Sequence, residues 1–180
     1  NDDAYELHKV IFGYEDIGNQ YFYHHNLKKL KKNKYLNNIK KMKKFTNLHK
    51  NFFIKIKKEF KLILDRNSNY LNWRYISRPD KKYYVFGYFI QKQLKGYCIL
   101  KLYKEDKVLR GHFVDIVAEQ KNKIIFDELI NYGLNFFKKN KCNEVNLWLQ
   151  GYKPFQKILH KNKFKKNNFR KFICKFNDKK

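Results

Sequence analysis

Two carboxylates near the middle of the chain have the spacing of a reactive pair. Asp115 and Glu119 are four residues apart, in and just after segment 108–118, whose apolar and β-branched residues predict a strand. Because side chains alternate across a strand, this spacing puts both on one face. Either carboxylate could accept a proton from an amine through a water molecule. The alternative is structural: Asp115 in a charge pair, and Glu119 as an acid preceding a helix.

A second cluster combines two aromatic rings with a guanidinium. Trp73, Arg74 and Tyr75 follow a polar stretch, 65–69, that is rich in helix-capping residues. Arg74 could hold a phosphate or a sugar carboxylate through two parallel hydrogen bonds. Equally, Trp73 could anchor the core while Arg74 pairs with an internal acid.

The cysteines and histidines lack the spacing of a metal site, so no bound metal is expected. Cys98, Cys142 and Cys174 form no C-x-x-C motif, and an odd, unpatterned set predicts reduced thiols in a cytoplasmic protein. The adjacent His24 and His25 lie in a polar, basic stretch and are expected to be solvent-exposed.

The formal net charge is +26, which is typical of proteins that bind nucleic acid or anionic surfaces. Nearly all of the 42 basic residues are lysine, however, whereas phosphate and base recognition relies on the planar fork of arginine. Lysine, asparagine, isoleucine, phenylalanine and tyrosine also share codons rich in A and T, so a biased genome is the alternative explanation. No apolar stretch approaches the roughly 18 residues of a membrane span, so none is expected.

Apolar periodicity predicts a mixed sheet with helices on both faces. Strand-like segments at 83–90, 96–103 and 108–118 are separated by short turns, which predicts an antiparallel meander. A helical segment, 126–137, then leads by a crossover to a strand at 144–149, which should lie parallel to the third strand. The fold class is therefore α/β (α+β). The other expected elements are helices at 45–60, 70–75 and 151–162 and a last strand at 169–176.

This order of elements resembles the GNAT N-acetyltransferase superfamily, a three-layer fold with a splayed parallel strand pair. The segment 70–75, followed by Pro79 and Tyr84, looks like a motif of GNAT-like proteins associated with bacterial surface-polysaccharide biosynthesis. The resemblance covers residues 48–176, which are expected to form the acyltransferase domain.

The resemblance implies a donor loop between the third strand and the long helix. In the family, the loop Arg-x-x-Gly-x-Gly/Ala and the helix N-terminus cradle the pyrophosphate of coenzyme A. Here Lys121 stands near the arginine position, while Ile124 and Phe126 replace small residues and are expected to narrow the cradle. Acetyl-CoA, or another acyl-CoA, is the implied donor. The implied donor-binding residues are Val117, Ala118, Lys121, Asn122, Lys123 and Ile124.

The family also implies catalytic and acceptor positions. Its leaving-group tyrosine falls by position on Leu159, and Tyr152, two turns earlier, is the candidate substitute. Asp115 or Glu119 would act as general base, and the Val117 and Ala118 amides would polarise the thioester carbonyl. Segment 73–75 would border the acceptor pocket.

The first residues resemble the end of another domain of the same kind. Phe12 to Gly18, followed by Tyr21 to Tyr23, looks like the closing helix and strand of a GNAT domain. Residues 1–26 are therefore expected to be the tail of a preceding domain that is absent from this chain. Residues 27–47 would be a basic helical connector, or alternatively a helix that binds nucleic acid or anionic lipid.

The function that these features predict is transfer of an acyl group from coenzyme A to an amine on a sugar or nucleotide sugar. Two alternatives stay open. A Fem-type transferase would use an aminoacyl-tRNA as donor, and a GNAT scaffold without catalysis would bind nucleic acid or an anionic surface.

Overall fold

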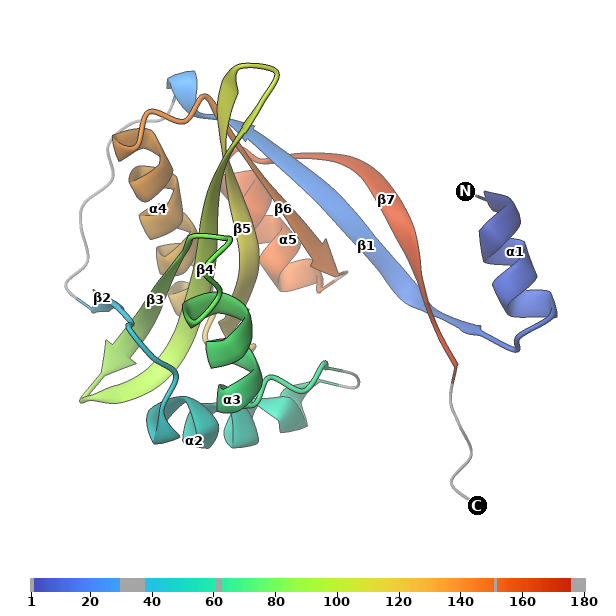
Figure 1. The fold of residues 1–180 in the computed structure, drawn as a ribbon, viewed down its shortest axis with the longest axis horizontal. Coiled ribbons are helices and arrows are strands. Elements are labelled where there is room, and N and C mark those ends of the chain that lie inside the picture. Colours follow the sequence, from blue (N-terminus) through green and yellow to red (C-terminus); the bar gives the residue numbers. More distant parts are fainter. Residues whose placement is uncertain (1, 30–37, 61–62, 151, 176–180) are drawn as a thin grey trace.

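The computed structural model describes residues 2–29, 38–60, 63–150 and 152–175. In this part of the chain seven strands form one sheet in the order β2-β3-β4-β5-β6-β1-β7 (Figure 1). Neighbouring strands are antiparallel except β5 and β6, which are parallel, as predicted. The strands are β1 (Glu15–Asn26), β2 (Ile39–Lys41), β3 (Tyr83–Ile90), β4 (Gln93–Glu105), β5 (Val108–Ala118), β6 (Glu144–Gln150) and β7 (Lys165–Cys174).

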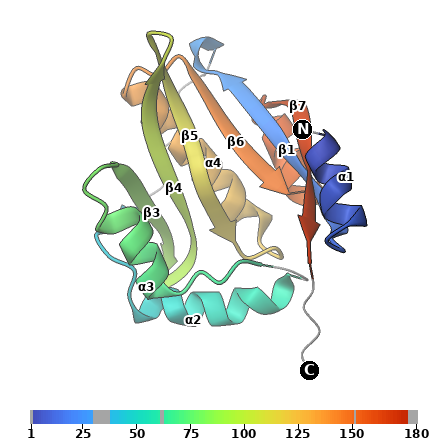
Figure 2. The same cartoon turned by 45° about the vertical axis from the view of Figure 1, so that its right-hand side comes forward.

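Helices cover the two faces of the sheet unequally (Figure 2). On one face, α4 (Lys123–Lys139) and α5 (Lys153–Lys161) bury the larger apolar cluster, which includes Leu100 and Phe113. On the other face, α2 (Asn47–Ile56) packs against Tyr97 and Ile99 in a second cluster. That cluster also includes α3 (Ser68–Leu71) and the π-helical turn Asn72–Ile76. The result is the predicted three-layer α/β arrangement, in which α2 and α3 leave part of their face uncovered.

The first strand belongs to this sheet. β1 lies between β6 and β7, and Tyr23 is fully buried beneath α5 and its neighbours. The sequence had assigned residues 1–26 to another domain, but their strand completes the sheet of 48–176. Before it, α1 (Asp2–Val10) ends ahead of Gly13, whose φ of +65° gives the left-handed turn that glycine favours after a helix.

The basic helix expected over 27–47 is wrong for the described part of that segment. Leu27–Lys29 is a short 3-10 turn, and Ile39–Lys41 is the edge strand β2, paired with β3. Residues 30–37 lie outside the described residues. The segment forms an edge strand rather than a helix, because the strand buries Ile39 in the apolar cluster of the sheet and leaves Lys40 and Lys41 exposed.

Within the described ranges, no helix combines the length and apolar character that crossing a membrane requires.

Substitution of Gly133 tests how closely α4 packs on the sheet. A Cβ added there would lie 2.4 Å from the ring of Phe113. Helix propensity alone favours Gly133→Ala by up to about 1 kcal/mol, but overpacking costs about 1–3 kcal/mol. We therefore expect the variant to lower the free energy of unfolding, measured by urea titration. Lys139→Ala, exposed near the end of the same helix, is the control and should change it by less than about 0.5 kcal/mol. A stabilised Gly133→Ala would contradict this packing.

Candidate functional site

The parallel strands β5 and β6 separate midway along the sheet. Their ladder runs from Arg110 opposite Glu144 to Phe113 opposite Leu147 and has no further pair. Beyond it, β5 continues to Ala118 and β6 to Gln150. The strands therefore form a V whose open end faces the start of α4, which gives the predicted splayed pair.

A β-bulge marks the point of separation. Ile99 of β4 pairs with Asp115 and the next residue, Leu100, pairs with Phe113, so Val114 is an extra residue in β5. The bulge turns Val114 and Asp115 to the same face, that of α2, while Phe113 stays in the α4 cluster. It thereby bends the strand away from β6 where the ladder ends.

Asp115 is held in an ion pair on the α2 side. Arg66 donates from Nε to Oδ2 at 2.9 Å and from Nη2 to Oδ1 at 3.3 Å. The Tyr97 hydroxyl donates to Oδ2 at 3.4 Å. Burial, and then the charge of Asp115, raise the pKa of Tyr97 well above 10, so this phenol stays protonated. Asp115 therefore joins the segment before α3 to the sheet and is not a free base.

Glu119 lies on the same side and is also paired. Its carboxylate accepts from Lys55 of α2 at 3.0 Å, and Lys95 lies 4.0 Å away. Gln120, the next residue of the loop, donates its backbone N–H to the carboxylate of Glu59, which follows α2, at 2.7 Å. Acidic side chains thus fix the first two residues of the loop to the α2 layer.

The rest of the loop, 121–124, is open to solvent. Lys121 and Lys123 are exposed, and Asn122 makes no side-chain capping bond to α4. The backbone N–H of Ile125 donates to the Asn122 carbonyl oxygen at 3.3 Å, whereas the N–H groups of Lys123 and Ile124 precede the first intrahelical bonds of α4. Ile124 is 67% exposed and points away from the core. The residues present fit a diphosphate, because both lysines and the helix dipole favour an anion at this position.

The bulky Phe126 does not narrow the loop. It is fully buried and stacks on Phe155 of α5, with ring centroids 3.9 Å apart and planes 4° apart. The side chain thus fills the contact between α4 and α5. The expectation that Phe126 crowds the cradle is therefore corrected, because its ring faces the core; the expectation for Ile124, which is exposed, stays a prediction.

Tyr152 bridges the open end of the V. Its hydroxyl donates to the carbonyl oxygen of Gln120 at 3.3 Å, and its ring packs edge-on against Phe155 at 4.8 Å. Leu159, the position implied for the leaving-group tyrosine, is fully buried. Among the predicted catalytic residues, Tyr152 alone has its polar atom between the ends of the two strands.

The segment 73–75 lies apart from this opening, in the π-helical turn; Trp73 and Arg74 are exposed, whereas Tyr75 is 9% exposed and belongs to the α2-side cluster. Trp73 is 62% exposed, so it does not anchor the core. Arg74 donates to the Tyr70 hydroxyl at 3.0 Å and lies over the Tyr70 and Tyr75 rings. The guanidinium is exposed and held by aromatic residues, which leaves hydrogen-bonding capacity for a ligand.

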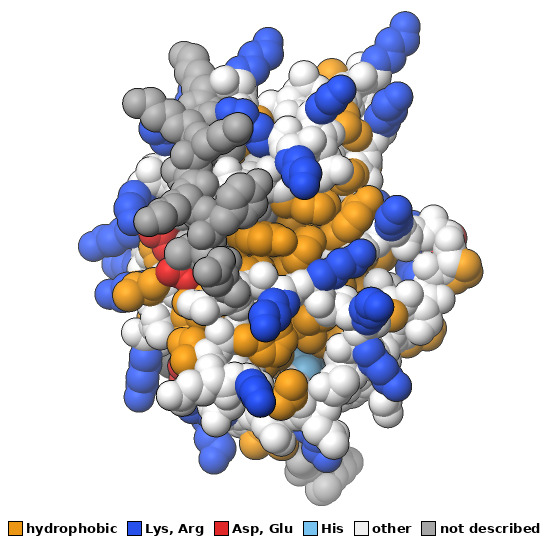
Figure 3. All heavy atoms as spheres, turned by 90° about the vertical axis from the view of Figure 1, so that its left-hand side faces the viewer, with side chains coloured by type: hydrophobic (Ala, Val, Ile, Leu, Met, Phe, Trp, Pro, Cys, Tyr) orange, Lys and Arg blue, Asp and Glu red, His pale blue; other side chains and the backbone are white. Residues whose placement is uncertain are grey.

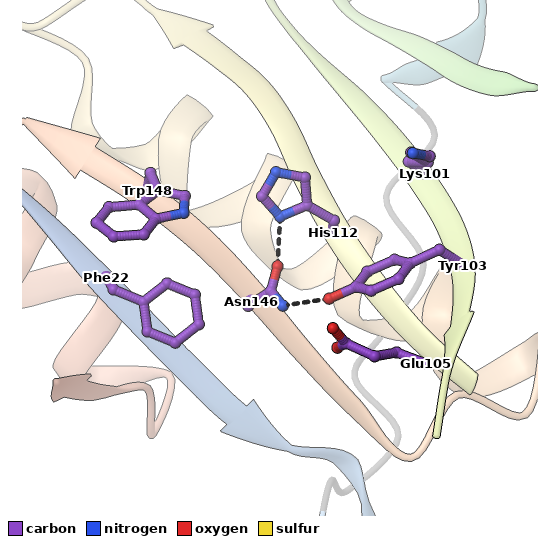
Figure 4. Close-up of a pocket in the computed structure, with 7 residues that line it drawn as sticks. All are labelled: Phe22, Lys101, Tyr103, Glu105, His112, Asn146 and Trp148. Carbon is purple, nitrogen blue, oxygen red and sulfur yellow. Dashed lines mark hydrogen bonds between the residues drawn. The ribbon is translucent and has the colours of Figure 1, made fainter. Parts of the chain in front are cut away.

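A hollow of about 380 Å³ opens on the sheet face that α2 and α3 leave uncovered (Figure 4). His112 and Asn146 lie at its floor, and Trp148 and Phe22 form one wall. Sequence reasoning missed these residues, although His112, Asn146 and Trp148 each occupy the polar phase of a predicted strand. Because they are distant in sequence, only the strand order brings them together.

The prediction for the adjacent histidines is also wrong. His25 is 4% exposed and packs on Phe164, and His24 bonds to Glu144 at 2.6 Å. Arg110 pairs with the same Glu144. The carboxylate that the local sequence lacks comes from β6, the neighbouring strand.

Lysine and arginine side chains surround an apolar area on the face formed by β3 and α4 (Figure 3). A second hollow, of about 350 Å³, lies between these elements. It is lined by Phe86, Tyr132, Phe136, Lys139 and Asn140.

Comparison by sequence finds no matching family model, and no curated protein matches the chain. Comparison by structure gives clear matches. A GCN5-related N-acetyltransferase from Anabaena variabilis superimposes with a TM-score of 0.70 at 11% identity, over 96% of this chain and 43% of its own. A protein of unknown function from Enterococcus faecalis, described as a probable N-acyltransferase, gives 0.68 at 12% identity, over 94% of this chain and 42% of its own.

N-myristoyltransferase of Saccharomyces cerevisiae with bound myristoyl-CoA gives a TM-score of 0.65 at 12% identity, over 86% of this chain and 49% of its own. The chain thus spans less than half the length of these three proteins. At such identities the likeness concerns architecture. The mixed sheet with one splayed parallel pair and helices on both faces is the GNAT fold.

Proposed function

We propose that the chain transfers an acyl group from a coenzyme A thioester to an amine, on a sugar or nucleotide sugar. The observation that carries the proposal is the V between β5 and β6, which opens directly onto the exposed N-terminal turn of α4. A matching fold in a protein with bound myristoyl-CoA supports an acyl-CoA donor.

The donor's diphosphate would bind at the start of α4. Lys121 and Lys123 would offset its charge, and the backbone N–H groups of Lys123 and Ile124 would donate to its oxygens; the Asn122 N–H already donates to the Glu119 carbonyl oxygen at 3.1 Å. Coenzyme A, when bound, supplies the activated thioester. Its pantetheine arm would enter the V and displace the Tyr152–Gln120 contact.

The chain's own groups would then assist direct attack by the amine, with no covalent enzyme intermediate. Alternate N–H groups of β5 point away from β4, so either Val117 or Ala118 directs one into the V and can polarise a carbonyl there. The Tyr152 hydroxyl can donate a proton to the leaving thiolate. Trp73 and Arg74 would bind a distal phosphate or sugar carboxylate of the acceptor, with the buried Tyr75 ring beneath the Arg74 guanidinium.

The surface charge supports a second candidate, binding of tRNA or another nucleic acid. Lysine and arginine side chains are spread over the face in Figure 3, and the net charge is +26. A steep log-linear fall of affinity with salt would identify this electrostatic binding, and aminoacyl-tRNA would then replace acyl-CoA as the donor to test.

The donor site can be tested by charge reversal in the loop. Lys121→Glu with Lys123→Glu should weaken acetyl-CoA binding by at least about tenfold, because two attractive charges become repulsive near the diphosphate. Isothermal titration calorimetry of the full chain gives the dissociation constant. Lys153→Glu with Lys157→Glu, exposed on α5, is the control of equal charge change. An equal loss in both pairs would show non-specific attraction, and no binding at millimolar acetyl-CoA would refute the donor proposal.

Tyr152→Phe separates catalysis from donor binding. The variant keeps the ring contact with Phe155 and removes the hydroxyl alone. We expect kcat to fall by about 10²-fold, in the range typical of a lost general acid, whereas acetyl-CoA affinity should stay constant or rise. Thiol release with glucosamine as acceptor measures the rate. Unchanged turnover would exclude Tyr152 as the acid.

Asp115→Asn and Glu119→Gln compare how much two ion-paired carboxylates, one in β5 and one just after it, contribute to stability. Asp115→Asn leaves the guanidinium of Arg66 without its charge partner, and the side chains of this pair are 14% and 20% exposed. We expect a loss of about 3 kcal/mol in unfolding free energy. Glu119→Gln should cost less than about 1 kcal/mol, because Lys55 is 61% exposed. Denaturant titration measures both, and equal losses would contradict the structural role of Asp115.

A further inference from the structure

The hollow on the open sheet face combines a hydrogen-bonded polar floor with an aromatic wall. Its lining comes from four adjacent strands: Phe22 from β1, Lys101, Tyr103 and Glu105 from β4, His112 from β5, and Asn146 and Trp148 from β6. Side chains from elements distant in sequence all point toward one space (Figure 4). The site is therefore built by the sheet, with no contribution from a loop.

The floor is a short chain of hydrogen bonds. The Asn146 amide nitrogen donates to the Tyr103 hydroxyl at 2.7 Å, and its amide oxygen bonds Nδ1 of His112. With the amide in this orientation, Nδ1 carries the proton, so Nε2 of His112 is an acceptor. The Tyr103 hydroxyl, which accepts from Asn146, keeps its own proton for donation to a ligand.

The charges around His112 favour its neutral form. Burial lowers the pKa of His112 below its ordinary value of 6.5; hydrogen bonds that the ring donates to Asn146 oppose this effect, and the Lys101 charge adds to it. Lys101 and Tyr103 face the ring from β4, Asn146 from β6, and Arg110 precedes it on the same face of β5. Arg110 is itself neutralised by Glu144 and by Glu105 at 2.5 Å.

The wall opposite Tyr103 is aromatic. The Phe22 and Trp148 rings have centroids 5.0 Å apart, and the Arg170 guanidinium lies 4.9 Å from the Trp148 ring. An apolar wall facing hydroxyl, amide and imidazole groups suits a ring with one C–H face and several hydroxyl groups. The volume of about 380 Å³ lies at the small end of ligand pockets, about 300–1,000 Å³, so it fits a single sugar ring.

The hollow also meets the V. His112 and Asn146 are directly paired across β5 and β6, one residue before the ladder ends at Phe113 and Leu147. Trp148 is the first residue of β6 beyond it. A ligand in the hollow therefore lies at the apex of the V, on the sheet face opposite α4. The donor loop lies at the other, open end of the V, where α4 begins.

We propose that this hollow binds an amino sugar and that Nε2 of His112 accepts the proton from its amine. The proposal rests on the proposed function and names its acceptor site and base. In the step, the amine nitrogen forms a bond to the thioester carbonyl carbon, and the C–S bond breaks. The ammonium proton passes to Nε2, the thiolate takes a proton from Tyr152, and water restores both side chains. Asn146 is a positioning residue that fixes the tautomer.

Binding can be measured without any donor. Calorimetry of the full chain with D-glucosamine should give saturable binding, weakened about tenfold by Trp148→Ala through loss of the aromatic contact. Phe169→Ala is the matched control, because Phe169 is an exposed aromatic residue paired with Tyr21 on the opposite sheet face. Absence of saturable binding, or an equal loss in both variants, would overturn the pocket.

Turnover tests the base. With acetyl-CoA and D-glucosamine, His112→Gln should lower kcat by about 10²–10⁴-fold while the sugar dissociation constant changes by less than about threefold. The acid limb of the wild-type pH profile, set by protonation of Nε2 below pH 6.5, should vanish in the variant. His160→Gln, exposed on α5, should change neither. A normal rate or a retained limb in His112→Gln would overturn the role of His112.

The two proposals fail in different ways. If acetyl-CoA does not bind, the proposed function and the base both fail, whereas glucosamine binding and the Trp148→Ala effect still decide the pocket. If turnover occurs with non-sugar amines and Trp148→Ala leaves it unchanged, the acyltransferase stands and the amino-sugar pocket is refuted.

Discussion

The separation of β5 from β6 after four paired residues is the constraint on which the rest of the structure depends. Backbone N–H and C=O groups inside a sheet need partners, yet those of β5 beyond Phe113 that face β6 have none from that strand. The extra residue Val114 makes the divergence a built feature of the sheet. Tyr152 and Gln120 then join the two strand ends across the gap. A ligand that reaches the same backbone groups would replace that contact.

The α2 face of the sheet presents both carboxylates and an imidazole, because the bulge changes which side chains of β5 point to that face. On the α2 side, Asp115 and Glu119 are used to attach that helical layer through Arg66 and Lys55. Both acids therefore have a structural role in holding the α2 layer. His112, two residues before the extra residue Val114, lies on the same face and bonds to the Asn146 amide. The inferred base is therefore the imidazole of His112, which does not hold the α2 layer.

Periodicity predicted the meander, the crossover helix and the parallel pair, because each depends on local alternation and on a handedness that has few exceptions. Three features lay beyond it. The place of β1 between β6 and β7 depends on pairing with strands more than a hundred residues away. The ion pair of Asp115 depends on Arg66, 49 residues away. The floor of the hollow joins His112 to Asn146 through strand order alone. In each case the local pattern fixed the face of the residue and left its partner open.

A loop without glycine can still bind a phosphate when its bulky side chains pack away from the phosphate position. Glycine at Phe126 would be required if the side chain had to share space with the ligand. Here α5 supplies Phe155 as a stacking partner, so the ring is buried on the side away from the loop. The dipole of α4 comes from its aligned backbone peptides, and the positive charge at its start comes from Lys121 and Lys123. Replacing the usual small residue by Phe126 removes neither. Departure from the usual loop sequence thus changes how α4 packs on α5 and leaves an anion site available at the helix terminus.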